Sequence, residues 1–86
     1  MTISTIITQR IKNANKRYWA GDNISAYLHD GDKEGLIEEL TEKFNGVLDS
    51  LIIDRDNDPN SHDTGKRLAK MYINELMAGR YNKMPN

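Results

Sequence analysis

The sequence predicts an all-α fold, in which an amphipathic N-terminal helix is followed by an antiparallel helical hairpin. Apolar residues recur every three or four positions in three separate stretches, which is the spacing of one face of an α-helix. No stretch shows the alternation of a half-buried strand, and turn-forming residues gather between the helical stretches. The pattern divides the chain into an amphipathic helix at residues 1–21 and a hairpin unit at residues 22–86.

The first helix is expected over about residues 2–19. Its apolar stripe consists of Ile3, Ile7, Ile11, Ala14 and Tyr18. A single helix of this length is marginal in water, so the stripe needs a surface to pack against. Gly21 predicts the end of the helix, and Tyr18 with Trp19 is expected to anchor that end.

Residues 22–32 are expected to be irregular. Asn23 is a candidate cap for a short turn that leads through Tyr27 and Leu28. The sequence Asp30-Gly31-Asp32 then predicts a loop before the next helix.

The second helix is predicted over about residues 33–53, with apolar residues on one side and acids on the other. Its apolar side consists of Leu36, Ile37, Leu40, Phe44, Val47, Leu48, Leu51 and Ile52. The acids Glu38, Glu39, Glu42 and Asp49 fit a solvated face better than a catalytic carboxylate pair. The polar loop 54–63 then joins this helix to the third and makes the antiparallel hairpin.

The third helix is predicted from Thr64 to Ala78. Thr64 is a good N-cap, and Gly79 is placed to end the helix in the left-handed conformation. Its apolar residues span more than half of the helical wheel, which predicts burial on more than one side. They are Leu68, Ala69, Met71, Tyr72, Ile73, Leu76 and Met77.

Composition excludes several classes of protein. Apolar residues make up 37% of the 86 residues and charged residues 29%, and the net charge is −1. Charge alternates along the chain from basic to acidic to basic, which argues against a nucleic-acid-binding face. No apolar run approaches the roughly 20 residues that cross a bilayer, so no membrane contact is expected. The absence of cysteine excludes disulfides and thiolate metal sites and fits a cytoplasmic protein.

Two polar groupings suggest metal sites but fit them poorly. Residues 54–58 read Asp-Arg-Asp-Asn-Asp and resemble the start of a calcium loop. Pro59 then occupies the place of the turn glycine, and Gly65 stands where a bidentate Glu is required. Turn chemistry alone explains this loop. His29 and His62 have no second ligand at metal spacing, so the chain is expected to hold no metal.

Arg67 and Lys70 are the candidate binding residues. They lie three residues apart near the start of the third helix, so their side chains point the same way. The positive end of the helix dipole and the planar fork of the guanidinium both favour an anion such as phosphate. The alternative is that both are solvated helix charges, with Arg67 paired to an acid such as Asp63.

A family resemblance supports the anion-binding interpretation. The stretch that contains the third helix resembles the signature of GTP cyclohydrolase I. It reads Asp63-Thr64-Gly65-Lys66-Arg67, then Leu68-Ala69-Lys70-Met71-Tyr72, and ends with Glu75-Leu76-Met77-Ala78-Gly79. The resemblance covers about residues 33–86 and is specific within 58–79. One position departs from it, because the family has Pro where this chain has Gly65, and Gly is not pre-organised for a helix start.

The resemblance implies a function for this segment. GTP cyclohydrolases I convert GTP and water to 7,8-dihydroneopterin triphosphate and formate in pterin biosynthesis, and they form homo-oligomeric rings. The matching Arg and Lys hold the GTP triphosphate, which implies that role for Arg67 and Lys70. The family's zinc ligands, two Cys and a His, and its catalytic His lie downstream of this segment and have no counterpart here. The 86-residue chain is therefore expected to be an N-terminal part that is inactive alone, with no cofactor of its own.

A second class of function stays open on the sequence. The broad apolar surface of the third helix and the stripe of the first both need a surface to cover. They fit a non-enzymatic helical interaction or regulatory module, and they predict self-association through these two helices.

Overall fold

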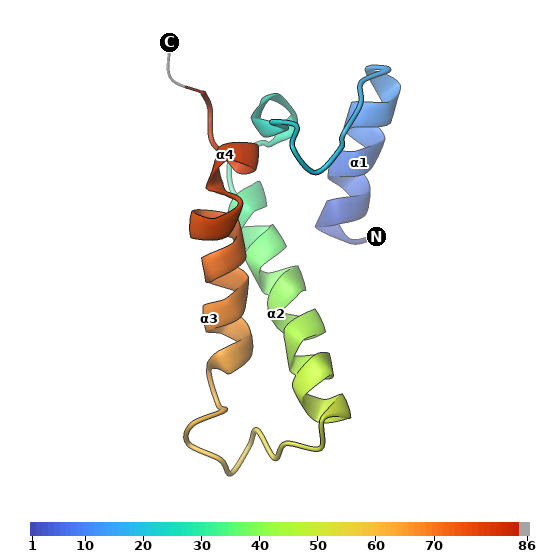
Figure 1. Cartoon of the computed structure of the whole chain (residues 1–86). Helices are drawn as coiled ribbons and strands as arrows, with labels where there is room; N and C mark the ends of the chain where they lie inside the picture. Colours follow the sequence, from blue (N-terminus) through green and yellow to red (C-terminus); the bar gives the residue numbers. More distant parts are fainter. Residues whose placement is uncertain (85–86) are drawn as a thin grey trace.

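The computed structural model describes residues 1–84 and confirms the all-α fold, with no strand in that range (Figure 1). Helices α2 and α3 run antiparallel as a hairpin, and α1 lies beside the first half of α2. A 3₁₀ turn precedes α2, and a π-helical turn separates α3 from α4. In chain order the elements are α1 (Ile3–Asn13), η1 (Ser25–Tyr27), α2 (Asp32–Ser50), α3 (Thr64–Met71), η2 (Tyr72–Leu76) and α4 (Ala78–Tyr81).

Helix α1 is shorter than the sequence predicted. The Thr2 side chain caps its start by accepting a hydrogen bond from the Thr5 amide, at 3.3 Å. The helix ends at Asn13, because Asn15 adopts a left-handed φ of 55°. The predicted continuation to residue 19 is therefore wrong, and Tyr18 lies outside the helix.

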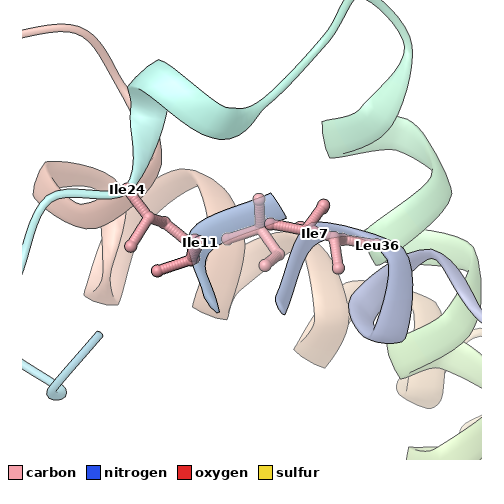
Figure 2. Close-up of a cluster of buried hydrophobic side chains, with 5 residues drawn as sticks. Ile7, Ile11, Ile24 and Leu36 are labelled. Atoms are coloured by element: carbon pink, nitrogen blue, oxygen red, sulfur yellow. The ribbon is translucent and has the colours of Figure 1, made fainter. Parts of the chain in front are cut away.

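The core lies where α1, α2 and η2 meet. Ile11 is 2% exposed and Ile73 is 1% exposed, the two most deeply buried large side chains among the described residues. Figure 2 shows the side chains of α1 directed at those of α2 and of the segment before η1. The buried cluster consists of Ile7, Ile11, Ile24, Leu36 and Ile73. The predicted need of the α1 stripe for a partner is thus met within the chain.

Polar contacts fix α1 against the first turns of α2. Arg10 Nη1 donates to Asp32 Oδ2 at 2.7 Å, and the His29 backbone N–H donates to the same oxygen at 2.8 Å. The His29 hydrogen bond, followed by that of Arg10, lowers the pKa of the Asp32 carboxyl. Further along α2, Glu39 accepts from the backbone N–H of Ser4 at 2.9 Å and from its hydroxyl at 2.5 Å. Glu39 is half-buried by this contact with α1, so its predicted place on the solvated acidic face is wrong.

Helix α2 agrees with the predicted second helix but buries only part of its apolar side. Leu36 and Leu48 are buried, as expected. Val47, Leu51 and Ile52 are 55%, 64% and 92% exposed, so the expectation that they pack inward is wrong. The reason is that α1 contacts only the first half of α2, which leaves the second half without a cover on that side.

The third predicted helix is interrupted. The π-helical turn Tyr72–Leu76 separates α3 from α4, so the chain is not one regular helix from Thr64 to Ala78. Burial is also one-sided, because Tyr72 is 38% exposed and Leu76 is 62% exposed. Gly79 lies within α4 without a positive φ and does not end a helix in the left-handed conformation.

The start of α3 also differs from the prediction. Thr64 is the first residue of the helix rather than its cap, and its hydroxyl donates to the Asn60 carbonyl at 3.1 Å. The N-cap position belongs to Asp63, whose side chain makes no capping hydrogen bond.

The loop between α2 and α3 is built from local turns, as predicted. The Asp54 carboxylate accepts from the backbone N–H of Asn57 at 3.3 Å and from its side-chain amide at 2.8 Å. Asp58 does the same for the Asn60 backbone and the Ser61 hydroxyl, at 2.9 and 2.7 Å. The Ser61 bond, followed by that of Asn60, lowers the pKa of Asp58.

No helix within residues 1–84 combines the length and the apolar character that crossing a bilayer requires.

Candidate functional site

Arg67 and Lys70 lie together on the outer surface of α3, and both are exposed. The only side-chain hydrogen bond of Arg67 within residues 1–84 is from Nη2 to the Thr64 hydroxyl, at 3.4 Å. Within this range neither cation forms an ion pair, so the pairing of Arg67 with Asp63 is not observed. With Lys66 they place three cations on the first two turns of α3, available to an anion.

The opposite side of α3 is held against α2 at Gly65. A Cβ atom built at Gly65 would overlap the Asn45 side-chain oxygen and lie 3.2 Å from the Thr41 carbonyl oxygen. Glycine is therefore favoured by the close approach of the two helices, since any larger residue would displace the Asn45 side chain and crowd the Thr41 carbonyl. Proline, the residue of the resembling family, carries a Cβ and would meet the same atoms. The departure at Gly65 thus has a packing reason, and this contact turns Arg67 and Lys70 outward.

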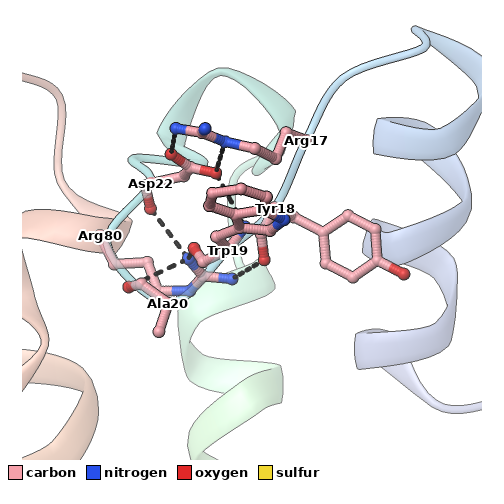
Figure 3. A network of polar contacts seen from close by, with 6 residues as sticks. All are labelled: Arg17, Tyr18, Trp19, Ala20, Asp22 and Arg80. Atoms are coloured by element: carbon pink, nitrogen blue, oxygen red, sulfur yellow. Dashed lines mark hydrogen bonds and ion pairs between the residues drawn. The ribbon is translucent and has the colours of Figure 1, made fainter.

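A second polar cluster, which the sequence did not predict, joins α4 to the segment that follows α1 (Figure 3). Arg80 of α4 donates to the backbone carbonyls of Trp19 at 2.6 Å, Asp22 at 2.9 Å, Tyr18 at 3.3 Å and Ala20 at 3.4 Å. No spacing rule relates Arg80 to residues so distant in sequence, so no sequence signal points to this contact.

The same segment returns hydrogen bonds to α4. The Asn23 side-chain amide donates to the carbonyls of Gly79 at 2.7 Å and Asn82 at 2.8 Å, and the Ile24 N–H donates to that of Arg80 at 2.8 Å. Asn23 also accepts from the Ser25 backbone N–H at 2.9 Å, but the N-cap of η1 is Ile24, so the prediction that Asn23 caps the short turn is wrong by one residue. Its amide is therefore used in holding the fold.

Arg17, Tyr18 and Trp19 form the exposed side of this cluster. Arg17 donates two hydrogen bonds to Asp22, at 2.9 and 2.8 Å, which raises the pKa of Arg17 and lowers that of Asp22. The Arg17 guanidinium also lies over the Trp19 ring, 4.1 Å from its centroid. Trp19 is 68% exposed and outside any helix, so the prediction that it anchors a helix end is wrong.

The histidines do not gather into a site. His29 and His62 are both exposed. Within residues 1–84 no three His, Cys, Asp or Glu side chains lie close enough to hold a metal ion. The zinc of the resembling family therefore has no set of ligands among the described residues, and no chemical step through zinc is assigned to them.

The fold and the surface of α3 thus define a helical hairpin with a row of outward cations. Comparison with known proteins adds no relative, because no family model, curated protein or solved structure matches the chain.

Proposed function

We propose that this chain is the amino-terminal helical part of a cytoplasmic enzyme resembling GTP cyclohydrolase I, in which Arg67 and Lys70 bind the triphosphate of GTP. The observation that supports the proposal is that both cations are exposed, side by side and free of ion pairs within residues 1–84. A charge left unpaired on a helix surface is available to a ligand without first breaking an internal contact.

The proposed role is binding, and the chain itself is inactive. The reaction consumes GTP and one water and releases formate and 7,8-dihydroneopterin triphosphate. The triphosphate is unchanged in it, so Arg67 and Lys70 would position the substrate while other residues act on the imidazole ring. Arg67 supplies paired N–H donors to the phosphate oxygens, and Lys70 supplies a compact positive charge.

Two measurements test the proposal. The chain alone, with or without zinc, should release no formate from GTP above the buffer rate; clear release would overturn the inactive part of the proposal. In an NMR titration, GTP should shift the amide signals of Arg67 and Lys70, and guanosine should not. If GTP and guanosine shift these amides equally, the cations do not recognise the triphosphate.

Variants sharpen the titration. A charge-assisted hydrogen bond is worth about 1.5–3 kcal/mol, so Arg67→Ala should weaken GTP binding by about ten- to a hundredfold. Lys43→Ala is the matched control, because it removes an exposed cation from α2 and leaves α3 intact. Equal weakening by both variants would point to general charge attraction, which falls with added salt.

A non-enzymatic interaction module is the second candidate. It is favoured by the exposed apolar residues near the end of α2, Val47 and Leu51. Reading the gene beyond codon 86 separates the candidates, since a continuing frame that encodes Cys-x-x-His supports the enzyme and a stop codon supports the module.

A further inference from the structure

Apolar side chains remain exposed along the second half of α2. Val47 is 55% exposed and Leu51 is 64% exposed. They continue a row from Phe44, whose ring stacks on Tyr72 of η2 with 5.5 Å between the ring centroids. We call the surface formed by Phe44, Val47, Leu51 and Tyr72 the hairpin face.

Ile52, which follows the hairpin face, is unfavourable in a free chain for two reasons. The residue is 92% exposed and has a φ of 65°, a left-handed conformation that a β-branched side chain rarely adopts. It occupies the position after the α2 cap where Gly is usual, because the Ile52 N–H bonds to the Asp49 carbonyl and the Ile53 N–H to the Leu48 carbonyl. An isoleucine at this position is explained if its side chain is buried by another molecule.

The spacing of apolar residues along α2 is that of a helix-pairing seam. They alternate at intervals of three and four, as the a and d positions of a heptad repeat do. The seam consists of Ile37, Leu40, Phe44, Val47 and Leu51. Ile37 and Leu40 pack against the core of the chain, whereas the rest of the seam extends beyond it.

Charge along the seam is compatible with a copy of the same helix. The flanking heptad positions are Thr41, Lys43, Leu48 and Ser50. None of them is acidic, and the acids Glu38, Glu39, Glu42 and Asp49 occupy other positions of the repeat. Two copies of α2 can therefore approach through this side without bringing their acids together.

The chain also exposes more surface than a compact monomer of its mass. Its accessible surface is 6325 Å² at 9.9 kDa, where the scaling for monomers gives about 5,200 Å². Its radius of gyration is 14.8 Å, against about 12 Å for a compact chain of this length. The excess surface is comparable to the roughly 800 Å² that each partner buries in a typical stable interface.

We propose that the hairpin face and Ile52 bind a second copy of this chain, with α2 of one copy along α2 of the other about a two-fold axis. In such an arrangement the same patch serves on both sides, so each exposed residue of the seam gains an apolar partner. The stripe of α1, expected from the sequence to take part in self-association, is instead used in the core through Ile7 and Ile11. The inference does not depend on GTP binding by Arg67 and Lys70.

Sedimentation equilibrium of the full chain tests the proposal. The wild type should form a dimer with a dissociation constant in the micromolar range, and Leu51→Glu should weaken it at least tenfold by placing charge in the seam. Gly46→Glu is the control, because it adds the same charge to an exposed position of α2 outside the seam and should leave the dimer intact. Circular dichroism confirms that each variant remains helical.

Ile52→Gly is a second variant that does not endanger the fold. Because the side chain is exposed and strained in the single chain, its removal should raise the thermal midpoint measured under monomeric conditions. It should also weaken the dimer. A wild type that stays monomeric at its highest soluble concentration overturns the proposal, as does a dimer that neither Leu51→Glu nor Ile52→Gly weakens.

Discussion

The two ends of the hairpin show two ways of stabilising the same pair of helices. Where α2 begins, α1, the segment 15–24 and α4 converge on it, and contacts between residues distant in sequence surround a buried apolar cluster. Where α2 ends, the turns of loop 54–63 are held by hydrogen bonds between residues two or three apart. The first end has its core within the chain, whereas the second has apolar side chains in solvent and only local bonds to order it. Stability should therefore be concentrated at the first end.

Deleting part of the buried cluster is the strongest test of this contrast. Ile73→Ala removes a side chain that is 1% exposed and should destabilise the chain by about 3 kcal/mol through lost burial and a residual cavity. Leu76→Ala, one turn away and 62% exposed, should cost under about 1 kcal/mol. Urea unfolding of both variants under monomeric conditions measures the difference. Equal losses would show that the buried cluster does not dominate stability.

Two glycines should respond to alanine with opposite signs. Gly65→Ala places a Cβ against Asn45 and the Thr41 carbonyl and should destabilise by about 1–3 kcal/mol. Gly46→Ala, on an exposed turn of α2 with nothing within 4 Å, should stabilise by about 0.5–1 kcal/mol. Thermal unfolding of each variant measures whether its midpoint falls or rises relative to the wild type.

A double variant identifies the atoms responsible at Gly65. Adding Asn45→Ala to Gly65→Ala removes the side-chain clash but leaves the Thr41 carbonyl in place, so it should recover part of the loss. Stabilisation by Gly65→Ala alone would contradict the close approach of α2 and α3.

Arg80 tests whether α4 and the segment that follows α1 stabilise each other. Arg80→Ala removes the hydrogen bonds to the carbonyls of residues 18–22 and should cost about 1–2 kcal/mol. Hydrogen exchange should accelerate at the Ile24 amide, which donates to the Arg80 carbonyl, before it accelerates within α3. Arg55→Ala, in the local pair with Asp49 at the other end, should leave the Ile24 amide unchanged. An unchanged Ile24 amide in Arg80→Ala would mean that the Arg80 contacts do not order this segment.

The features that depend on local contacts could be predicted from the sequence, and those that depend on contacts between distant residues could not. Helical spacing correctly predicted that Ile7, Ile11 and Leu36 face inward, because each helix presents them on one side regardless of its neighbours. The same spacing wrongly predicted burial of Leu51 and Ile52. Whether an apolar side of a helix is covered depends on how far α1 extends, and the early end of α1 at Asn13 has only weak local signals.

The candidate site was predictable in part. Helical geometry predicted that Arg67 and Lys70 share one side of α3, and the structure places both on its exposed surface. Their lack of ion pairs within residues 1–84 depends on side-chain rotamers and on the close contact at Gly65, which the sequence alone does not reveal. Their role toward GTP stays a prediction.

The smallest expected effect is a difference in how the two ends respond to acid. The pKa of Asp32 is lowered, chiefly by the His29 amide and then by Arg10, and the pKa of Asp49 is lowered chiefly by Arg55. A carboxyl whose pKa is lower in the folded chain stabilises it above the ordinary value of 3.8, and this contribution is lost as the pH falls through the lowered value. Asp32 is only 11% exposed at its side chain and ties α1 to α2, whereas Asp49 is 54% exposed in a local pair. Asp32→Asn should therefore lower stability at neutral pH and flatten the loss of stability below about pH 4, and Asp49→Asn should do so only slightly. Thermal midpoints measured from neutral pH down to about pH 2 compare the two variants, and a larger effect of Asp49→Asn would reverse the ranking of the two ends.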